Sequence, residues 1–228
     1  MNTYQLNKPF WILWMVEFWE RFGYYGATAI LVLYFIKDLG YDESESYYLF
    51  GAFTAMVYGF VWVGGWLGDV YLGSKRTLML GSVILACAYL ALTFANRDLI
   101  FYALAGIVVG NALFKANPAA LISKMYTRED PAFVSAMTFY YVAVNLGALC
   151  SMAITPMIMQ QVGVSHAFGV SALGLIVGLS LFTYHASALN HLHHDVGRKP
   201  LSLNRLGVVL LGCVCAVILI AQCLMHPL

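Results

Sequence analysis

Three ionisable residues stand close together in an apolar stretch near the N-terminus. Glu17, Glu20 and Arg21 occupy positions i, i+3 and i+4, so in a helix they share one face, where a carboxylate can pair with the guanidinium. A charge at the bilayer centre costs about 2.5–3.5 kcal/mol on insertion scales, which makes each of them a functional candidate. Two acids against one base leave a carboxylate whose proton occupancy can depend on what else enters the site. The trio suits proton coupling; the alternative is that Arg21 only neutralises a carboxylate and fixes packing.

A fourth charge, Lys115, stands midway along the apolar stretch VVGNALFKANPAAL, with Asn111 one turn earlier on the same helix face. Pro118 lacks an N–H, so the carbonyl of Phe114 loses its helical partner and a kink beside the lysine is expected. A lysine facing lipid is costly, so we expect Lys115 to face other spans or a wet cavity. The surplus carboxylate near the N-terminus is its nearest compensating charge. A purely structural Glu–Lys bridge is the alternative.

Tyrosines and an asparagine extend this polar set. The stretch FYYVAVNLGAL places Tyr141 and Asn145 four residues apart on one helix face, and Tyr24 and Tyr25 continue the stripe of the charged trio. An asparagine both donates and accepts hydrogen bonds, as a peptide backbone requires, and a tyrosine offers an aromatic wall with a hydroxyl. Tyr58, in the expected second span, is a candidate of the same kind. Taken alone, such aromatic residues more often serve packing than ligand binding.

The segment from Gly64 to Thr77, GGWLGDVYLGSKRT, combines glycines with charges. Glycines permit close helix approach, and Asp69 precedes Lys75 and Arg76 across the expected turn. An acid and a base at neighbouring helix ends can hold them together in one state and release them in another.

The composition is that of a membrane protein: 61% of the 228 residues are hydrophobic and 10% are charged, against roughly 25% charged in soluble domains. A net charge of +1 offers no surface for nucleic acid. No nucleotide-binding or hydrolase motif occurs, so an enzyme has no candidate site. The HLHH run lacks the ligand set of a metal centre. The five cysteines are interpreted as small buried hydrophobes.

A membrane span requires about 20 mostly apolar residues, and the sequence contains seven such stretches. They cover about residues 10–36, 47–68, 77–95, 99–123, 133–160, 167–189 and 205–225. The predicted fold is therefore all-α and polytopic, with a six-helix transmembrane bundle over 1–189, a cytoplasmic linker over 190–204 and a seventh span over 205–228.

Positive charges predict the orientation, because loops rich in lysine and arginine stay cytoplasmic. With the N-terminus inside, the cytoplasmic segments hold Lys8, Lys75, Arg76, Lys124, Arg128, Arg198, Lys199 and Arg205. The opposite side holds only Lys37 and Arg97. We therefore expect a multi-pass protein of the cell (inner) membrane with a cytoplasmic N-terminus.

These motifs resemble, in order, those of the proton-dependent oligopeptide transporters, the peptide-transporting branch of the major facilitator superfamily. EFWERFGYYG (residues 17–26) looks like the family's ExxERFxYYG signature, and GGWLGDVYLGSKR looks like the superfamily's loop motif. GNALFKANPAALISKMY and FYYVAVNLGAL resemble the fourth- and fifth-span signatures. The resemblance implies import of di- and tripeptides driven by the proton gradient, through alternating access between two six-helix bundles, with no cofactor.

The resemblance also implies roles for individual residues. The proton-coupling set would be Glu17, Glu20, Arg21 and Lys115. The peptide pocket would be lined by Tyr24, Tyr25, Tyr58, Lys115, Tyr141 and Asn145, with Asn145 near the peptide amino group and Lys115 near its carboxylate. The gating set would be Asp69, Lys75 and Arg76.

The sequence departs from the family in two places. Thr28 stands where some members have an arginine that holds the peptide carboxylate. The chain also stops one span after the linker, where full members continue into a second bundle, so it matches an N-terminal half and is expected not to transport alone. The alternatives are transport of another small solute, or a non-transporting seven-span membrane partner.

Overall fold

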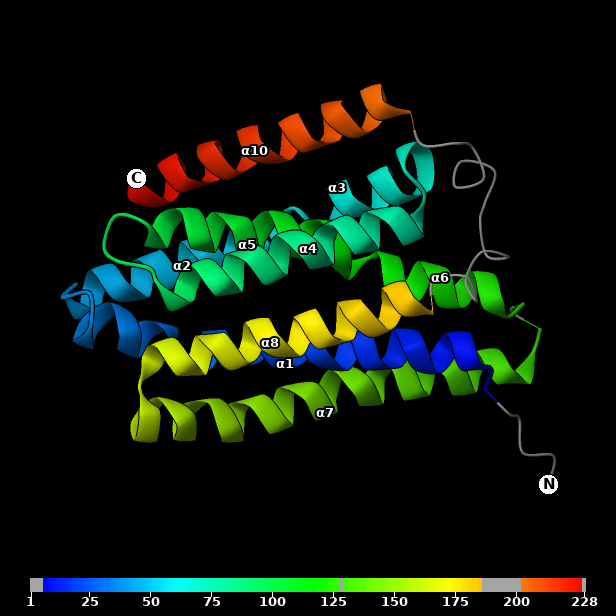
Figure 1. The fold of residues 1–228 in the computed structure, drawn as a ribbon, viewed down its shortest axis with the longest axis horizontal. Helices are drawn as coiled ribbons and strands as arrows, with labels where there is room; N and C mark the ends of the chain where they lie inside the picture. Colours follow the sequence, from blue (N-terminus) through cyan, green and yellow to red (C-terminus); the bar gives the residue numbers. More distant parts are fainter. Residues whose placement is uncertain (1–5, 128, 186–201, 227–228) are drawn as a thin grey trace.

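The computed structural model describes residues 6–127, 129–185 and 202–226, and regular structure within these ranges is entirely helical. The helices, in chain order, are α1 (Lys8–Lys37), α2 (Glu43–Gly59), α3 (Val61–Trp66), the π-helical turn η1 (Leu67–Tyr71), α4 (Ser74–Thr93), α5 (Ile100–Lys115), α6 (Asn117–Met125), α7 (Pro131–Val162), α8 (Val164–Tyr184) and α10 (Leu203–Met225). They lie side by side along the long axis of the molecule (Figure 1). The predicted all-α polytopic fold is confirmed.

Six helical segments in the described ranges are long and apolar enough to cross a membrane. They are Glu43–Tyr71, Ser74–Thr93, Ile100–Met125, Pro131–Val162, Val164–Tyr184 and Leu203–Met225. α1 is not among them, because its charged trio and polar aromatic residues lower its hydropathy. Its 30 residues still extend about 45 Å at 1.5 Å per residue, and it runs the length of the bundle between α7 and α8 (Figure 1). Each of the seven predicted spans therefore corresponds to a helical segment.

The predicted break beside Lys115 is present. α5 ends at Lys115 and α6 begins at Asn117, so the fourth span consists of two helical pieces. Pro118 lies at the start of α6, where its missing N–H is tolerated. By contrast, α7 continues through Pro156 without interruption.

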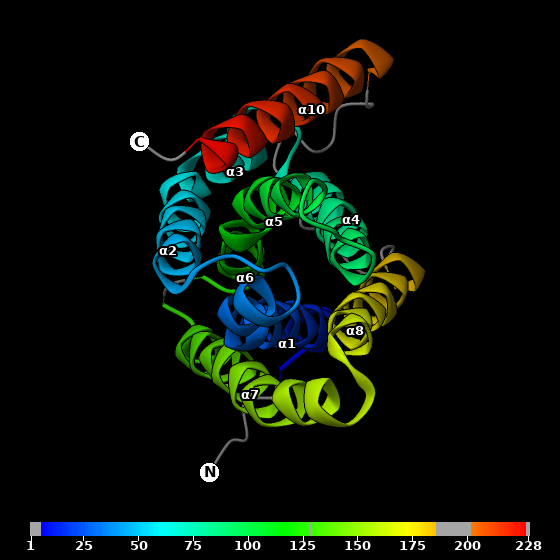
Figure 2. The same cartoon turned by 90° about the vertical axis from the view of Figure 1, so that its left-hand side faces the viewer.

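Glycines allow the helices to approach closely around α1. A Cβ atom added at Gly147 of α7 would lie 2.5 Å from the Phe18 carbonyl oxygen of α1, and one at Gly174 of α8 would overlap the Trp19 ring. Small residues at such crossings are typical of membrane helix packing. α1 consequently lies inside the bundle, packed between α7 and α8, while α4 and α5 form the next layer and α10 packs on α5 (Figure 2).

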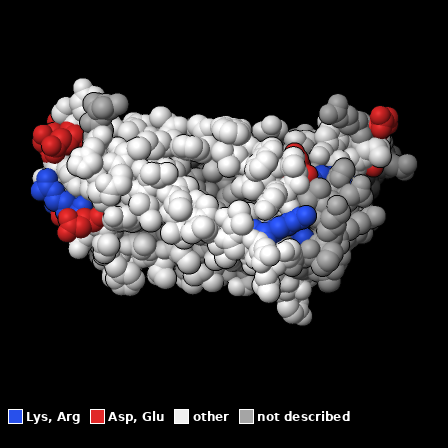
Figure 3. All heavy atoms as spheres, turned by 90° about the horizontal axis from the view of Figure 1, so that it is seen from above, with Lys and Arg blue, Asp and Glu red and all other residues white. Residues whose placement is uncertain are grey.

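Charged side chains on the face seen in Figure 3 gather toward the two ends of the long axis, and an uncharged band separates them.

Asn7 links the start of α1 to α6. Its side chain caps α1 by accepting a hydrogen bond from the Phe10 N–H at 3.1 Å. The Tyr126 hydroxyl donates to the same Asn7 side chain at 3.1 Å. The start of α1 is thus joined to the end of α6.

Some sequence predictions differ from the structure or fall outside it. None of the five cysteines is buried: Cys87, Cys215 and Cys223 are exposed and Cys150 and Cys213 are half-buried, because the apolar stretches that hold them present one side to lipid. α10 begins at Leu203, two residues before its predicted start. The rest of the predicted linker, with the HLHH run, Arg198 and Lys199, lies outside the described residues, as does Arg128.

Candidate functional site

The charged trio of α1 is buried. The exposed fractions are 2% for Glu17, 0% for Glu20 and 2% for Arg21. The Arg21 Nε atom lies 3.3 Å from Glu17 Oε1, and the guanidinium also pairs with the Glu20 carboxylate. The i, i+4 spacing thus places Glu17 on Arg21, and Glu20, the neighbour of Arg21 in sequence, pairs with the same guanidinium.

Two further residues complete the surroundings of the trio. Asn111 of α5, itself fully buried, donates from Nδ2 to Glu20 Oε1 at 3.1 Å. Tyr140 of α7 is buried and its hydroxyl lies beside the Glu17 carboxylate. The cluster of Glu17, Glu20, Arg21, Asn111 and Tyr140, called the buried cluster below, therefore lies where α1, α5 and α7 meet.

Sequence reasoning assigned neither Asn111 nor Tyr140 to the trio. The helical spacing predicts that Asn111 shares the face of Lys115, but nothing in the spacing shows which carboxylate Asn111 meets across the bundle. Tyr140 precedes the predicted site residue Tyr141 in the same stretch, and only the rotation of α7 shows that Tyr140 is the one that turns inward.

Lys115 is half-buried at the last position of α5, beside the break in the fourth span. Its Nζ atom lies 4.0 Å from the centroid of the Tyr58 ring on α2, a cation–π contact. It is within electrostatic range of Glu20, Glu17 and Arg21, yet it forms no ion pair with either carboxylate among the described contacts. Arg21, which lies on α1 with Glu17 and Glu20, pairs with both carboxylates. The ammonium group of Lys115 instead contacts the Tyr58 ring.

The tyrosines connect the buried cluster to the surface. Arg21 Cζ lies 5.5 Å from the centroid of the buried Tyr24 ring, which packs edge-on against Tyr25 at 5.3 Å. Both tyrosines interact with the side chain of Tyr58, half of which is exposed. Polar groups therefore continue from the interior to the surface along α1 and α2.

The remaining predicted pocket residues lie apart from this path. Tyr141 and Asn145 are exposed on α7, and the Asn145 side chain donates to the Tyr141 carbonyl at 2.8 Å. The Thr28 hydroxyl donates within its own helix, to the carbonyls of Tyr24 at 3.0 Å and Tyr25 at 3.2 Å. The Tyr141 ring packs edge-on against Tyr140 with centroids 5.7 Å apart, but neither Tyr141 nor Asn145 forms a hydrogen bond or ion pair with the charged trio among the described contacts.

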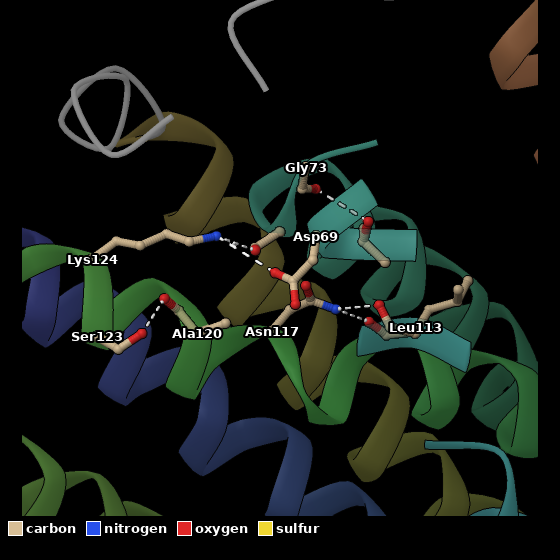
Figure 4. A network of polar contacts seen from close by, with 10 residues as sticks. Asp69, Gly73, Leu113, Asn117, Ala120, Ser123 and Lys124 are labelled. Carbon is tan, nitrogen blue, oxygen red and sulfur yellow. Dashed lines mark hydrogen bonds and ion pairs between the residues drawn. The ribbon is translucent and has the colours of Figure 1, made fainter. Parts of the chain in front are cut away.

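The loop motif is tied to the fourth span. Lys124 of α6 lies 3.8 Å from Asp69 Oδ1 and donates to the Ser74 hydroxyl at 2.8 Å, as Figure 4 shows. Sequence reasoning paired Asp69 with the start of the third span through Lys75 and Arg76, and it missed Lys124. Of these two, Lys75 is buried and Arg76 partly exposed.

The buried side chain of Asn117 forms hydrogen bonds at the break in the fourth span. Its Nδ2 atom donates to the Leu113 carbonyl of α5 at 2.6 Å and to the Gly64 carbonyl of α3 at 3.3 Å, and Figure 4 shows the side chain between the two helices. Carbonyls at a helix end lack intrahelical partners, so Asn117 supplies one and joins the second span to the fourth.

A bundle of membrane-length helices with a buried carboxylate–guanidinium cluster and a half-exposed lysine defines a polytopic membrane protein with intramembrane charge. The profile of the POT family matches residues 75–211, and the chain belongs to this family. The resemblance inferred from the motifs is confirmed.

Relatives and solved structures agree with this assignment. Dipeptide and tripeptide permease B of Aeromonas hydrophila is 42% identical over 97% of this chain and 44% of its own length. Dipeptide and tripeptide permease A of Chromobacterium violaceum is 40% identical over 100% of this chain and 46% of its own. A solved bacterial homologue of the human drug peptide transporters PepT1 and PepT2 superposes with a TM-score of 0.89 at 35% identity, over 95% of this chain and 50% of that one. The chain thus spans about half the length of the curated relatives it matches.

Proposed function

We propose that this chain supplies the N-terminal bundle of a proton-coupled importer of di- and tripeptides in the cell (inner) membrane, with its N-terminus cytoplasmic. Membership of the POT family and the names of its relatives support the substrate class. The driving force is the proton gradient, with no cofactor, and the proposal includes no enzymatic step.

The observation that carries the proposal is the charge balance of the buried cluster. Two carboxylates share the single guanidinium of Arg21, in an interior where an unbalanced charge is expensive. A proton that binds to Glu17 or Glu20 removes the surplus negative charge and weakens that residue's hold on Arg21. The packing of α1 against α7 and its hydrogen bond to Asn111 of α5 then depend on protonation, which biases a two-state equilibrium between the open states.

The substrate would meet this cluster through Lys115. Its ammonium group lies over the Tyr58 ring and is half-buried, so it can exchange this contact for the carboxylate of a peptide. Such an exchange changes the electrostatic field at Glu20 and Glu17, with which the lysine already interacts. Peptide binding and proton binding are coupled in this way. Tyr24, Tyr25 and Tyr58 would form one wall of the pocket, with Tyr141 and Asn145 further along.

A second bundle is the partner that the proposal requires. Alternating access needs two bodies that move around a shared site, and the exposed polar side chain of Asn145 within the long apolar helix α7 suits a protein-lined cavity better than lipid. We expect the 228 residues alone to import no peptide.

The test is a chimera in which this chain is joined to the remaining half of the Aeromonas hydrophila permease. Uptake of a labelled dipeptide should occur in cells with the chimera, should stop when an ionophore collapses the proton gradient, and should be absent with this chain alone. Excess unlabelled dipeptide should compete, whereas free amino acids should not. Competition by amino acids in place of peptides would assign another substrate.

Two variants test the residues. Glu20→Gln and Lys115→Ala in the chimera should each abolish proton-driven accumulation, whereas Glu43→Gln and Lys37→Ala, at exposed positions near one end of the bundle, should not. Proton-driven accumulation at the parental level in both site variants would refute the mechanism.

A further inference from the structure

An apolar groove lies on the side of the bundle where α10 packs, away from the buried cluster. It has a volume of about 510 Å³ and runs between α3 and η1, α5, and α10. Its walls include Val63 and Trp66 from the second span, Val109 and Ala112 from α5, and Gly212 of α10. No charged side chain is among its lining residues.

The dimensions of the groove identify what can occupy it. The lining residues of α10 run from Val208 to Ile220, about 18 Å of helix rise at 1.5 Å per residue. This is close to the roughly 15 Å depth of one leaflet, half of a hydrocarbon core about 30 Å thick. The groove is apolar and about as long as one leaflet is deep, so it suits a hydrocarbon chain.

One end of the groove carries aromatic rings and a cation. The rings of Trp66 and Tyr71 stack with centroids 6.5 Å apart, and Arg205 Cζ lies 5.8 Å from the Tyr71 centroid. Arg205 is exposed, and the ion pairs of the described residues give it no carboxylate partner. Tryptophan, tyrosine and arginine at such a position are typical of the membrane interface, and a basic side chain there attracts lipid phosphate.

We propose that this groove binds a phospholipid, with one acyl chain between α10 and α5 and the phosphate at Arg205. The apolar walls of the groove take the acyl chain. The guanidinium supplies charge complementarity at the depth where headgroups lie. The bound acyl chain fills the gap between α10 and the bundle, so the lipid stabilises the packing of the seventh span.

The test uses the chain purified in detergent, native mass spectrometry and added phosphatidylglycerol. A Cβ atom added at Gly212 or at Gly207 meets no other atom within 4 Å, but only Gly212 lines the groove. Gly212→Phe should reduce the fraction of protein with one bound lipid at least tenfold, and Gly207→Phe should leave it unchanged. Gly212→Leu should reduce it by an intermediate amount, which separates filling of the groove from misfolding of the larger variant.

A second arm tests the headgroup. The wild-type chain should retain phosphatidylglycerol in preference to diacylglycerol with the same acyl chains, and Arg205→Gln should remove that preference. Equal lipid retention by Gly212→Phe and Gly207→Phe, or an unchanged preference in Arg205→Gln, would overturn the proposal. The proposal would also be overturned if the wild-type chain formed a lipid-free dimer and Gly212→Phe dissociated it. A second copy of the chain would then cover the groove.

Discussion

Removal of Arg21 should destabilise the protein far more than removal of Glu20, because the buried cluster holds two acids and one base. Arg21→Gln leaves Glu17 and Glu20, both nearly inaccessible to solvent, without a directly paired cation, since Lys115 forms no ion pair with either among the described contacts. Removing one partner from a buried ion pair costs about 3–5 kcal/mol, since the remaining charge is uncompensated. Glu20→Gln instead leaves Arg21 and Glu17 as a balanced pair 3.3 Å apart.

The expected cost of Glu20→Gln is correspondingly small. A glutamine still accepts the hydrogen bond that Asn111 donates to Glu20, so the loss is about that of one hydrogen bond, roughly 0.5–1.5 kcal/mol. For a chain of this length, about 2–4 °C of unfolding temperature corresponds to 1 kcal/mol. Arg21→Gln should therefore lower the unfolding temperature by roughly 6–20 °C, and Glu20→Gln by no more than about 6 °C.

The assay is thermal unfolding in detergent, followed by the fluorescence of the five tryptophans at neutral and at acidic pH. The deficit of Arg21→Gln should shrink as the pH falls, because a bound proton removes one of the two uncompensated charges. Arg97→Gln is the control, since Arg97 is exposed and its contact is the Tyr41 ring at 4.6 Å. A smaller deficit for Arg21→Gln than for Glu20→Gln, or one that grows in acid, would refute the proposed charge balance.

Two further variants test the packing that positions the buried cluster. Gly147→Ala should force α7 about 1 Å away from α1, because its Cβ would lie 2.5 Å from the Phe18 carbonyl oxygen and a C···O contact needs about 3.3–3.6 Å. The unfolding temperature should fall by the equivalent of about 1–3 kcal/mol. The control Gly51→Ala, at a site with nothing within 4 Å, should not lower it. Asn117→Leu should lower the unfolding temperature by the equivalent of about 1–3 kcal/mol, because it leaves a buried carbonyl without a partner and removes the hydrogen bond to Gly64 of α3. An unchanged value would show that Asn117 does not help to hold the two spans together.

The local features of this protein follow from its sequence because they depend on short distances along the chain. The helical period places Glu17 and Arg21 on one face, and the structure pairs them as that spacing predicts. The missing N–H of Pro118 likewise predicts the break after Lys115. The apolar stretches predict the spans, since a bilayer of constant thickness requires helices of a particular length and composition.

The partners across helices are decided by tertiary packing. Periodicity gives the face of a residue within its own helix, but the rotation and depth of one helix against another depend on close contacts such as that of Gly147 with α1. For this reason the sequence alone did not pair Asn111 with Glu20 or Lys124 with Asp69.

The same limit applies to Lys115 and to the apolar groove. The sequence shows that the lysine needs a partner inside the protein, but only the packed bundle shows Tyr58 beneath its ammonium group. The groove arises because α10 packs on α5 without filling the space beside α3. Hydropathy, which treats every apolar side chain alike, carries no information about such a gap.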